Sequence, residues 1–194
     1  MTHLHRTMAL VMVWFCIPHL SVAQHKVVAD TTVCSAIMDS VKLYSYRYDA
    51  NDSLRYFAQK LLTCSEEIAD VDGQLEALSV LGITCIRENN YDEALAFFER
   101  NQKLALKVGN RKVEAQVLIN VASVYTSLES SKRAMEMLMH SAKIFEEEGD
   151  SAMLVYTYTN IGILFGKIKE RKEQLAIVER RSPWEVGLSR AEGP

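Results

Sequence analysis

Two asparagines, Asn120 and Asn160, stand 40 residues apart in stretches that otherwise have helical periodicity. An amide side chain carries N–H donors and a carbonyl acceptor, so it can hold the backbone of an extended peptide without reading its side chains. Asparagine is unfavourable inside a helix, so its return at one position needs an explanation. Two explanations are open. Either the amides bind a partner segment, or they bond to the neighbouring helix and stabilise the fold.

Residues that could support catalysis or bind a metal are few. The sequence has no Ser/His/Asp set, no glycine-rich phosphate loop and no CxxC pair, and His25 and His140 are its only histidines beyond residue 23. The net charge is −3, and no basic block is present that could neutralise phosphates. We therefore predict a protein that is not an enzyme, needs no cofactor or metal, and does not bind nucleic acid.

The elements that position these residues repeat with a period of 40. Residues 19–182 contain no proline, as a stack of helices requires. A shift of the sequence by 40 residues brings apolar, small and turn residues into register. The matched sets are Leu81-Gly82, Val121-Ala122 and Ile161-Gly162; Cys85, Tyr125 and Phe165; Phe98, Leu138 and Val178; Ala94 and Ala134; Gly109 and Gly149. Such a period indicates a solenoid of helical hairpins.

Each repeat divides into two helices, because apolar residues recur within it at spacings of three and four. Gly109 and Gly149 suit the left-handed position that ends a helix, and Asn110 and Asp150 are good caps for the helix that follows. The helices are expected at about 31–48, 52–69, 72–89, 91–108, 111–128, 131–148, 151–168 and 171–182.

This pattern resembles the tetratricopeptide (TPR) repeat, in the extended class with a period of about 40 residues seen in bacterial signalling proteins. The resemblance covers residues 72–178 well and 32–70 poorly, and Gln174 replaces the TPR alanine in the last repeat. It implies an all-α, right-handed solenoid of antiparallel helix pairs, with about four hairpins and the last one incomplete. The best repeat places Leu81-Gly82, Cys85, Ala94 and Phe98 at the Leu-Gly, aromatic, Ala and Phe positions.

The resemblance also implies where a partner binds. In TPR arrays the first helix of each hairpin lines a concave groove that holds a protein or peptide segment, with no catalysis. Here the groove is nearly neutral, and Tyr156 is its aromatic anchor. Only Asn120 fits the pattern of TPR domains that hold a C-terminal carboxylate, so that mode of recognition is not expected. The predicted groove residues are Arg87, Gln116, Asn120, Ser123, Tyr156, Asn160 and Lys167.

The first 23 residues resemble a secretory signal peptide. An apolar run over 8–17 is followed by Pro18 and by Ser21-Val22-Ala23, which predicts cleavage after Ala23. A run of about 10 apolar residues is too short to span a bilayer, which needs about 20. We expect an exported, periplasmic protein whose mature chain has no membrane span. The alternative is a chain tethered to the membrane by an uncleaved N-terminal segment.

Three cysteines, Cys34, Cys64 and Cys85, remain beyond the signal peptide, an odd number for an oxidising compartment. One interpretation is that all three are small buried apolar residues. A Cys64–Cys85 disulfide is the one pairing that we would test, because the repeat register places these residues on neighbouring helices.

The repeat pattern fails from Pro183, and no amphipathic helix follows to cap the solenoid. Leu164, Leu175 and Val178 are therefore expected to face water unless the tail folds back and Trp184 covers them. The chain could instead be a piece of a longer protein. The predicted divisions are a signal peptide (1–23), an N-terminal segment with a degenerate hairpin (24–71), a TPR array (72–182, with repeats at about 72–110, 111–150 and 151–182) and an irregular tail (183–194).

Two functions follow from this organisation. The first is a protein-interaction module, as the exported sensor part of a larger signalling regulator, because similar exported TPR arrays precede a membrane helix and a cytoplasmic output domain. The second is a structural or assembly protein that self-associates through its uncapped C-terminal end.

Overall fold

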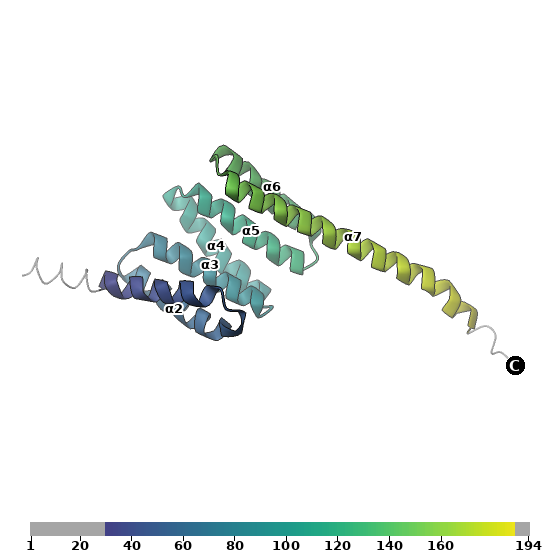
Figure 1. The fold of residues 1–194 in the computed structure, drawn as a ribbon, viewed down its shortest axis with the longest axis horizontal. Coiled ribbons are helices and arrows are strands. Elements are labelled where there is room, and N and C mark those ends of the chain that lie inside the picture. The colour runs from purple at the N-terminus through teal and green to yellow at the C-terminus, as the bar shows by residue number, and fades with distance from the viewer. Residues whose placement is uncertain (1–29, 189–194) are drawn as a thin grey trace, which may run out of the picture. The chain divides into compact units, whose positions relative to one another are not determined.

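The computed structural model describes residues 30–188, with side chains as far as Ala176 except for Tyr48; the predicted signal peptide lies outside these residues. All regular structure in the described range is helical (Figure 1), which confirms the all-α prediction. The chain divides into two compact units, Met1–Asn101 and Gln102–Pro194. The elements are a helix over 30–45, η1 Tyr48–Ala50, α2 Asn51–Glu67, α3 Val71–Arg87, α4 Tyr91–Val108, α5 Arg111–Ser127, α6 Ser131–Glu147 and α7 Ser151–Leu188.

The helices from α2 to α7 are separated by turns of one design. A residue with positive φ ends each helix, at 20-residue intervals, and the next residue then donates its backbone N–H to the carbonyl five residues earlier, as Asn110 does to Ala105 at 2.9 Å. Side-chain oxygens of Asp70, Asn110 and Asp150 accept a backbone N–H in the first turn of the next helix. The predicted caps at 109, 110, 149 and 150 are therefore confirmed. The positive-φ residues are Ala69, Asn89, Gly109, Glu129 and Gly149.

Small residues let the two helices of a hairpin approach closely. A Cβ atom at Gly82 in α3 would lie 2.3 Å from a ring carbon of Phe98 in α4, so no larger residue fits without movement. The same unit contains a buried hydrogen bond from Asn101 Nδ2 to the carbonyl of Leu75, 2.8 Å long. At Gly82 the structure thus shows the packing reason for a small residue at this repeat position.

The second unit repeats this arrangement with different chemistry. Ser141 in α6 donates its hydroxyl to the carbonyl of Ala115 in α5 at 2.9 Å, and both donor–acceptor pairs are 26 residues apart in sequence. Helices α5, α6 and α7 enclose one apolar core. The core residues include Ala115, Leu118, Ile119, Ala122, Ala134, Leu138, Ile144, Phe145 and Leu164.

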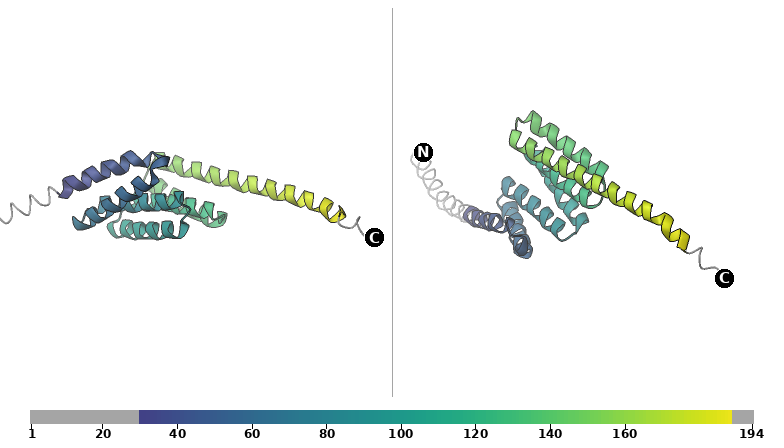
Figure 2. Two further views of the ribbon diagram at one scale, coloured as in Figure 1. Left: turned by 90° about the horizontal axis from the view of Figure 1, so that it is seen from below. Right: turned by 45° about the vertical axis from the view of Figure 1, so that its right-hand side comes forward.

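The predicted last hairpin is wrong, because α7 is one continuous helix of 38 residues that passes through Pro183 to Leu188. The helices predicted over 151–168 and 171–182 are one element, and the irregular tail does not begin at 183. In Figure 2 the yellow end of α7 extends well beyond α5 and α6. A turn here would place Lys169 at the positive-φ position and Glu170 at the cap, and neither residue type favours those roles. Good helix formers occupy 167–176 instead.

Of two further expectations at this end, one is corrected and one is confirmed. Leu164 does not face water, because it lies on the face of α7 that packs into the core of the second unit. Leu175 is exposed, as expected. Pro183 lacks an N–H and so removes one intrahelical hydrogen bond, but its fixed φ is compatible with a helix.

The structure contradicts both interpretations of the cysteines: Cys64 does not pair with Cys85, and Cys34 and Cys64 are not free buried thiols. The disulfide bond joins Cys34 to Cys64, with a Cα–Cα distance of 5.8 Å, and Cys85 is buried and free. Cys34 and Cys64 belong to the helix over 30–45 and to α2, where the repeat pattern is weak, so the register gave no basis for placing them. Cys85 instead lies 3.4 Å from the guanidinium of Arg55 in α2.

Candidate peptide-binding face

Six of the seven predicted groove residues lie in the second unit, on α5 and α7. Their spacing of three, four and seven residues places them on one face of each helix. Helices α5 and α7 contact each other, and Gln116 and Asn120 stand 40 positions before Tyr156 and Asn160, as Ser123 does before Ile163. We call these residues, together with exposed Ile163, the polar face: Gln116, Asn120, Ser123, Tyr156, Asn160, Ile163 and Lys167.

The two asparagines differ in their hydrogen bonds. Asn120 is half-buried, and its amide makes no hydrogen bond to any residue in the described part of the chain. Asn160 donates its Nδ2 to the carbonyl of Tyr156, one turn earlier in α7, at 2.9 Å. Within residues 30–188, neither amide therefore bonds to a neighbouring helix, and that structural explanation of their recurrence finds no support.

The remaining residues of the polar face offer an aromatic ring among short polar groups. Tyr156 is 53% exposed, and Ile163, two turns further along α7, is exposed as well. Ser123 donates its hydroxyl to Ile119 of its own helix at 3.2 Å, which leaves the oxygen able to accept. Gln116 and Lys167 are exposed. The polar face can thus bind the backbone of a partner segment through the amides of Asn120 and Asn160. It can also pack one side chain of that segment against the ring of Tyr156.

Arg87 does not belong to this face. It lies in the first unit, is half-buried, and donates Nη2 to the backbone carbonyl of Ser45 at 3.1 Å. The guanidinium therefore joins α3 to the helix over 30–45. A binding role for Arg87 stays a prediction, and the contact that the structure shows is one that stabilises the unit.

Sequence reasoning missed an ion-pair network centred on Arg55. Its guanidinium contacts Glu88 Oε2 at 2.6 Å and Glu93 Oε1 at 2.7 Å, and so links α2, α3 and α4. The hydrogen bond from Arg55 lowers the pKa of Glu93, and the hydrogen bond to Glu93 raises the pKa of Arg55. Arg55 is more than 30 positions from both glutamates, and no motif in the sequence connects them.

The same region contains Cys85, the free thiol of the described residues. Burial raises the pKa of Cys85 to about 11, although the nearby Arg55 charge acts in the opposite direction. A thiol with this pKa is protonated at neutral pH and is a poor nucleophile. Cys85 is thus a packing residue, and of the three cysteines it alone agrees with the interpretation of small buried apolar residues.

No three His, Cys, Asp or Glu side chains in the described range are arranged to hold a metal ion. None of the helices between residues 30 and 188 combines the length and apolar character needed to cross a bilayer.

Comparison with known proteins defines the fold. Neither a protein-family model nor a curated protein sequence matches the chain. The crystal structure of the apo form of RapI matches with a TM-score of 0.62 and 17% identity, over 77% of this chain and 53% of RapI. The crystal structure of BtubC from P. vanneervenii matches with a TM-score of 0.60 and 20% identity, over 85% of this chain and 66% of BtubC.

This chain has a helical-repeat fold. At these identities the likeness establishes the architecture alone. The chain spans about half the length of RapI, at 53%, and 66% of the length of BtubC. The hairpins built on a 40-residue period agree with this architecture.

Proposed function

We propose that this chain is a TPR-type, non-catalytic interaction module that binds an extended segment of another protein along the polar face of α5 and α7. The observation that carries the proposal is the state of Asn120: its half-buried amide has no hydrogen-bond partner within residues 30–188, beside other exposed polar groups. The Asn120 amide is not sealed from water, so the backbone of a bound segment can replace its water molecules and pair with its donor and acceptor groups. The TPR assignment is supported by the Leu-Gly, Ala and Phe positions of the repeats.

The chemistry of the face indicates the kind of segment that it binds. Asn120 and Asn160 can donate to and accept from a peptide backbone, which gives affinity with little dependence on sequence. Tyr156 can pack against one apolar or aromatic side chain and use its hydroxyl at the rim. Lys167 adds one positive charge. We therefore propose a mostly uncharged partner segment with one large apolar side chain.

Two tyrosines of α7 provide a matched test. Tyr156 and Tyr158 are equally exposed, at 53%, but they lie on different faces of the helix. The purified chain would be used to capture proteins from an envelope extract, with Tyr156→Ala, Tyr158→Ala and the double variant Asn120→Ala/Asn160→Ala in parallel. We expect a partner that is retained by wild type and by Tyr158→Ala and lost with the other two. Equal capture by all four proteins, or a lowered melting temperature of Tyr156→Ala, would contradict the proposal.

We also propose that the protein is exported to the periplasm. The Cys34–Cys64 disulfide supports this location, because such bonds persist in oxidising compartments and are rare in the cytosol. The apolar run and the Ser21-Val22-Ala23 site support it independently. Cell fractionation and N-terminal sequencing test it: a periplasmic product that begins at Gln24 is expected, and a cytoplasmic product that retains Met1 contradicts it.

The role of the module as the sensor part of a larger signalling regulator is proposed on family architecture alone. An antibody against the module would reveal its natural product by immunoblot. A product longer than 194 residues with a membrane-bound portion is expected. A product of 194 residues or fewer would remove this part of the proposal and leave the interaction module intact.

A further inference from the structure

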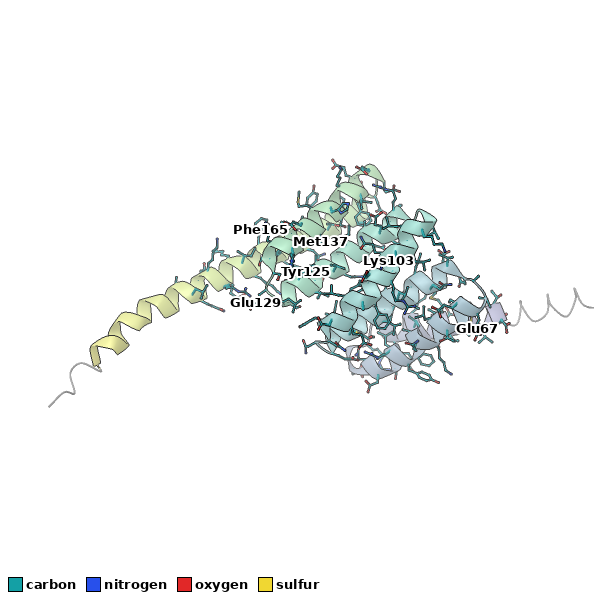
Figure 3. All side chains as sticks on the ribbon, turned by 180° about the vertical axis from the view of Figure 1, so that it is seen from behind. Glu67, Lys103, Tyr125, Glu129, Met137 and Phe165 are labelled. Atoms are coloured by element: carbon teal, nitrogen blue, oxygen red, sulfur yellow. A yellow bond between two sulfur atoms is a disulfide. The ribbon has the colours of Figure 1, made fainter. Side chains whose placement is uncertain are left out.

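One face of α7 has no covering helix within the described residues. Val155, Tyr158 and Phe165 are 66%, 53% and 59% exposed, and a Cβ atom built at Gly162 would meet nothing within 4 Å. Their spacing of three and four residues places them in one line along the helix. We call these four residues the α7 stripe. Phe165 is labelled on α7 in Figure 3.

The same positions are covered in the two preceding repeats. The residues 40 and 80 positions earlier are all buried, apart from half-buried Tyr125. In the first unit the ring of Phe98 fills the space above Gly82, which is the counterpart of Gly162. The α7 stripe is therefore a packing surface for a helix. The covered counterparts are Leu75, Leu78, Gly82 and Cys85 in α3, and Ala115, Leu118, Ala122 and Tyr125 in α5.

The residues that follow in the same chain are poorly suited to cover the stripe. Gln174 occupies the repeat position of the fully buried Ala134, and Arg181 occupies that of the buried donor Ser141. The carbonyl of Val155, which such a donor would reach, already accepts the hydroxyl of Thr159 at 2.9 Å. Because α7 continues straight, its own C-terminal half leaves the stripe open.

The stripe is complementary to itself in the antiparallel direction. When two copies of α7 are related by a two-fold axis beside Gly162, the two Gly162 residues face each other and allow close approach. Tyr158 of each copy then lies opposite Gly166 of the other, where a built Cβ also meets nothing within 4 Å. Phe165 lies opposite Thr159. Large side chains thus face small ones, as ridges packed into grooves require.

The charges along α7 favour the same arrangement. In this pairing Lys169 and Lys172 of one copy lie level with Val155 and Ala152 of the other, close to where α7 begins. Near that start lie Asp150 and the acidic end of α6, residues 146–148. Part of this acidic charge is paired within its own chain, Asp150 with Lys112 and Glu147 with Arg111, but the end stays net negative. The basic part of each helix therefore meets an acidic part of the other copy, whereas a parallel pair would place like charges together.

We propose that the α7 stripe is a self-association surface, through which two copies of this chain pair antiparallel about an axis at Gly162. Such an isologous contact uses the same patch twice and closes on itself. A paired length of residues 151–173 extends about 34 Å at 1.5 Å per residue, which is at the small end of specific interfaces. The pairing is thus reversible, dependent on protein concentration, and weakened by salt.

Sedimentation and light scattering of the purified full chain across a wide concentration range test the proposal. The expected mass rises toward twice that of the monomer and falls back when salt is added. Phe165→Glu and Tyr158→Glu should each remain monomeric while their helical circular dichroism is unchanged. The matched control is Ile163→Glu, on the polar face of the same helix and similarly exposed, and it should associate as wild type does.

Cysteine cross-linking fixes the geometry. A Gly162→Cys chain should form a disulfide-linked dimer on mild oxidation, because the axis brings the two residues together, and an Ile163→Cys chain should not; the unsubstituted chain is the baseline. A monomer at every concentration would overturn the proposal. So would a dimer that persists in both glutamate variants, or equal cross-linking of the Ile163→Cys and Gly162→Cys chains. Capture of a different protein through Phe165 by a monomeric chain would also overturn it. Tyr156→Ala should leave the dimer intact, so this test is independent of partner binding on the polar face.

Discussion

Two glycines at equivalent repeat positions provide a test of the packing argument. Gly82 lies under Phe98, whereas Gly162 has open space around its Cα. Alanine is favoured over glycine inside a helix by about 1 kcal/mol, and this gain is available at both positions. The two substitutions therefore differ only in what the new methyl group meets.

At Gly82 the methyl group would lie 2.3, 2.5 and 2.8 Å from three ring carbons of Phe98, a side chain with no exposed surface into which it could swing. Overpacking of this kind costs about 1–3 kcal/mol. Subtraction of the helix-propensity gain leaves Gly82→Ala less stable than wild type by up to about 2 kcal/mol. At Gly162 nothing opposes the gain, so Gly162→Ala should be more stable by about 0.5–1 kcal/mol.

The assay is urea unfolding followed by circular dichroism, at a protein concentration where the chain is monomeric. Hydrogen exchange of the amides in α4 and α7 provides a local measure for each substitution. The difference between the two variants isolates the overpacking cost of about 1–3 kcal/mol. If both alanine variants gain stability equally, Phe98 is not seated on Gly82, and the explanation for small residues in this repeat is refuted.

Two further predictions concern the first unit. Cys34→Ser, or reduction of the Cys34–Cys64 disulfide across its separation of 30 residues, should lower the free energy of unfolding by about 3–4 kcal/mol, and reducing agent should then have no effect on the variant. Arg55→Met should cost about 0.5–1 kcal/mol near neutral pH, because the ion pairs of Arg55 are partly exposed. The pKa of Glu93 is lowered in the folded state, so the pair stabilises the fold above the ordinary glutamate pKa and this contribution is lost as the pH falls through the lowered pKa. Unfolding curves of wild type and Arg55→Met should converge on acidification; a constant gap would show that only the packing of the arginine stem was lost.

The turns show how far sequence could define the fold. The left-handed conformation of Gly109 and Gly149 could be predicted from the residue type, because glycine adopts it without steric cost. Ala69 and Glu129 adopt the same conformation, and nothing in their chemistry signals it. They could be placed only because the 40-residue period and helix length leave room for one turn there. Helices α2 to α6 were predicted within two residues at each end for this reason.

The last repeat shows where the same reasoning failed. The 40-residue period predicts a turn near residue 169. The period reflects the pattern common to all repeats, whereas a turn forms only if the residues at that position favour it. Glu170 is a poor cap and Gln174 is too large for the close contact that Ala94 and Ala134 make. Both residues can be seen in the sequence to differ from the repeat pattern, and together they favour a continuous helix over a turn.

The sequence predicted which helix face the residues of the candidate site occupy, but not the hydrogen bonds that their side chains make. The register placed Asn120, Tyr156 and Asn160 on one face, as the structure has them. It could not show that Asn160 bonds within its own helix while Asn120 has no partner in the described range, because such choices depend on side-chain rotamers. Nor could it show that Arg87 contacts Ser45, which lies outside the clear repeats.

The covalent link between the helix over 30–45 and α2 has a consequence for proteolysis. The connection between these helices includes Tyr46, which is 91% exposed, and Arg47, and exposed connections are where proteases cut first. Both residues lie between Cys34 and Cys64, so a nick there opens the backbone without releasing a fragment. The severed helix stays tethered to its neighbour at high local concentration and can pack again, until a reductant separates the two pieces.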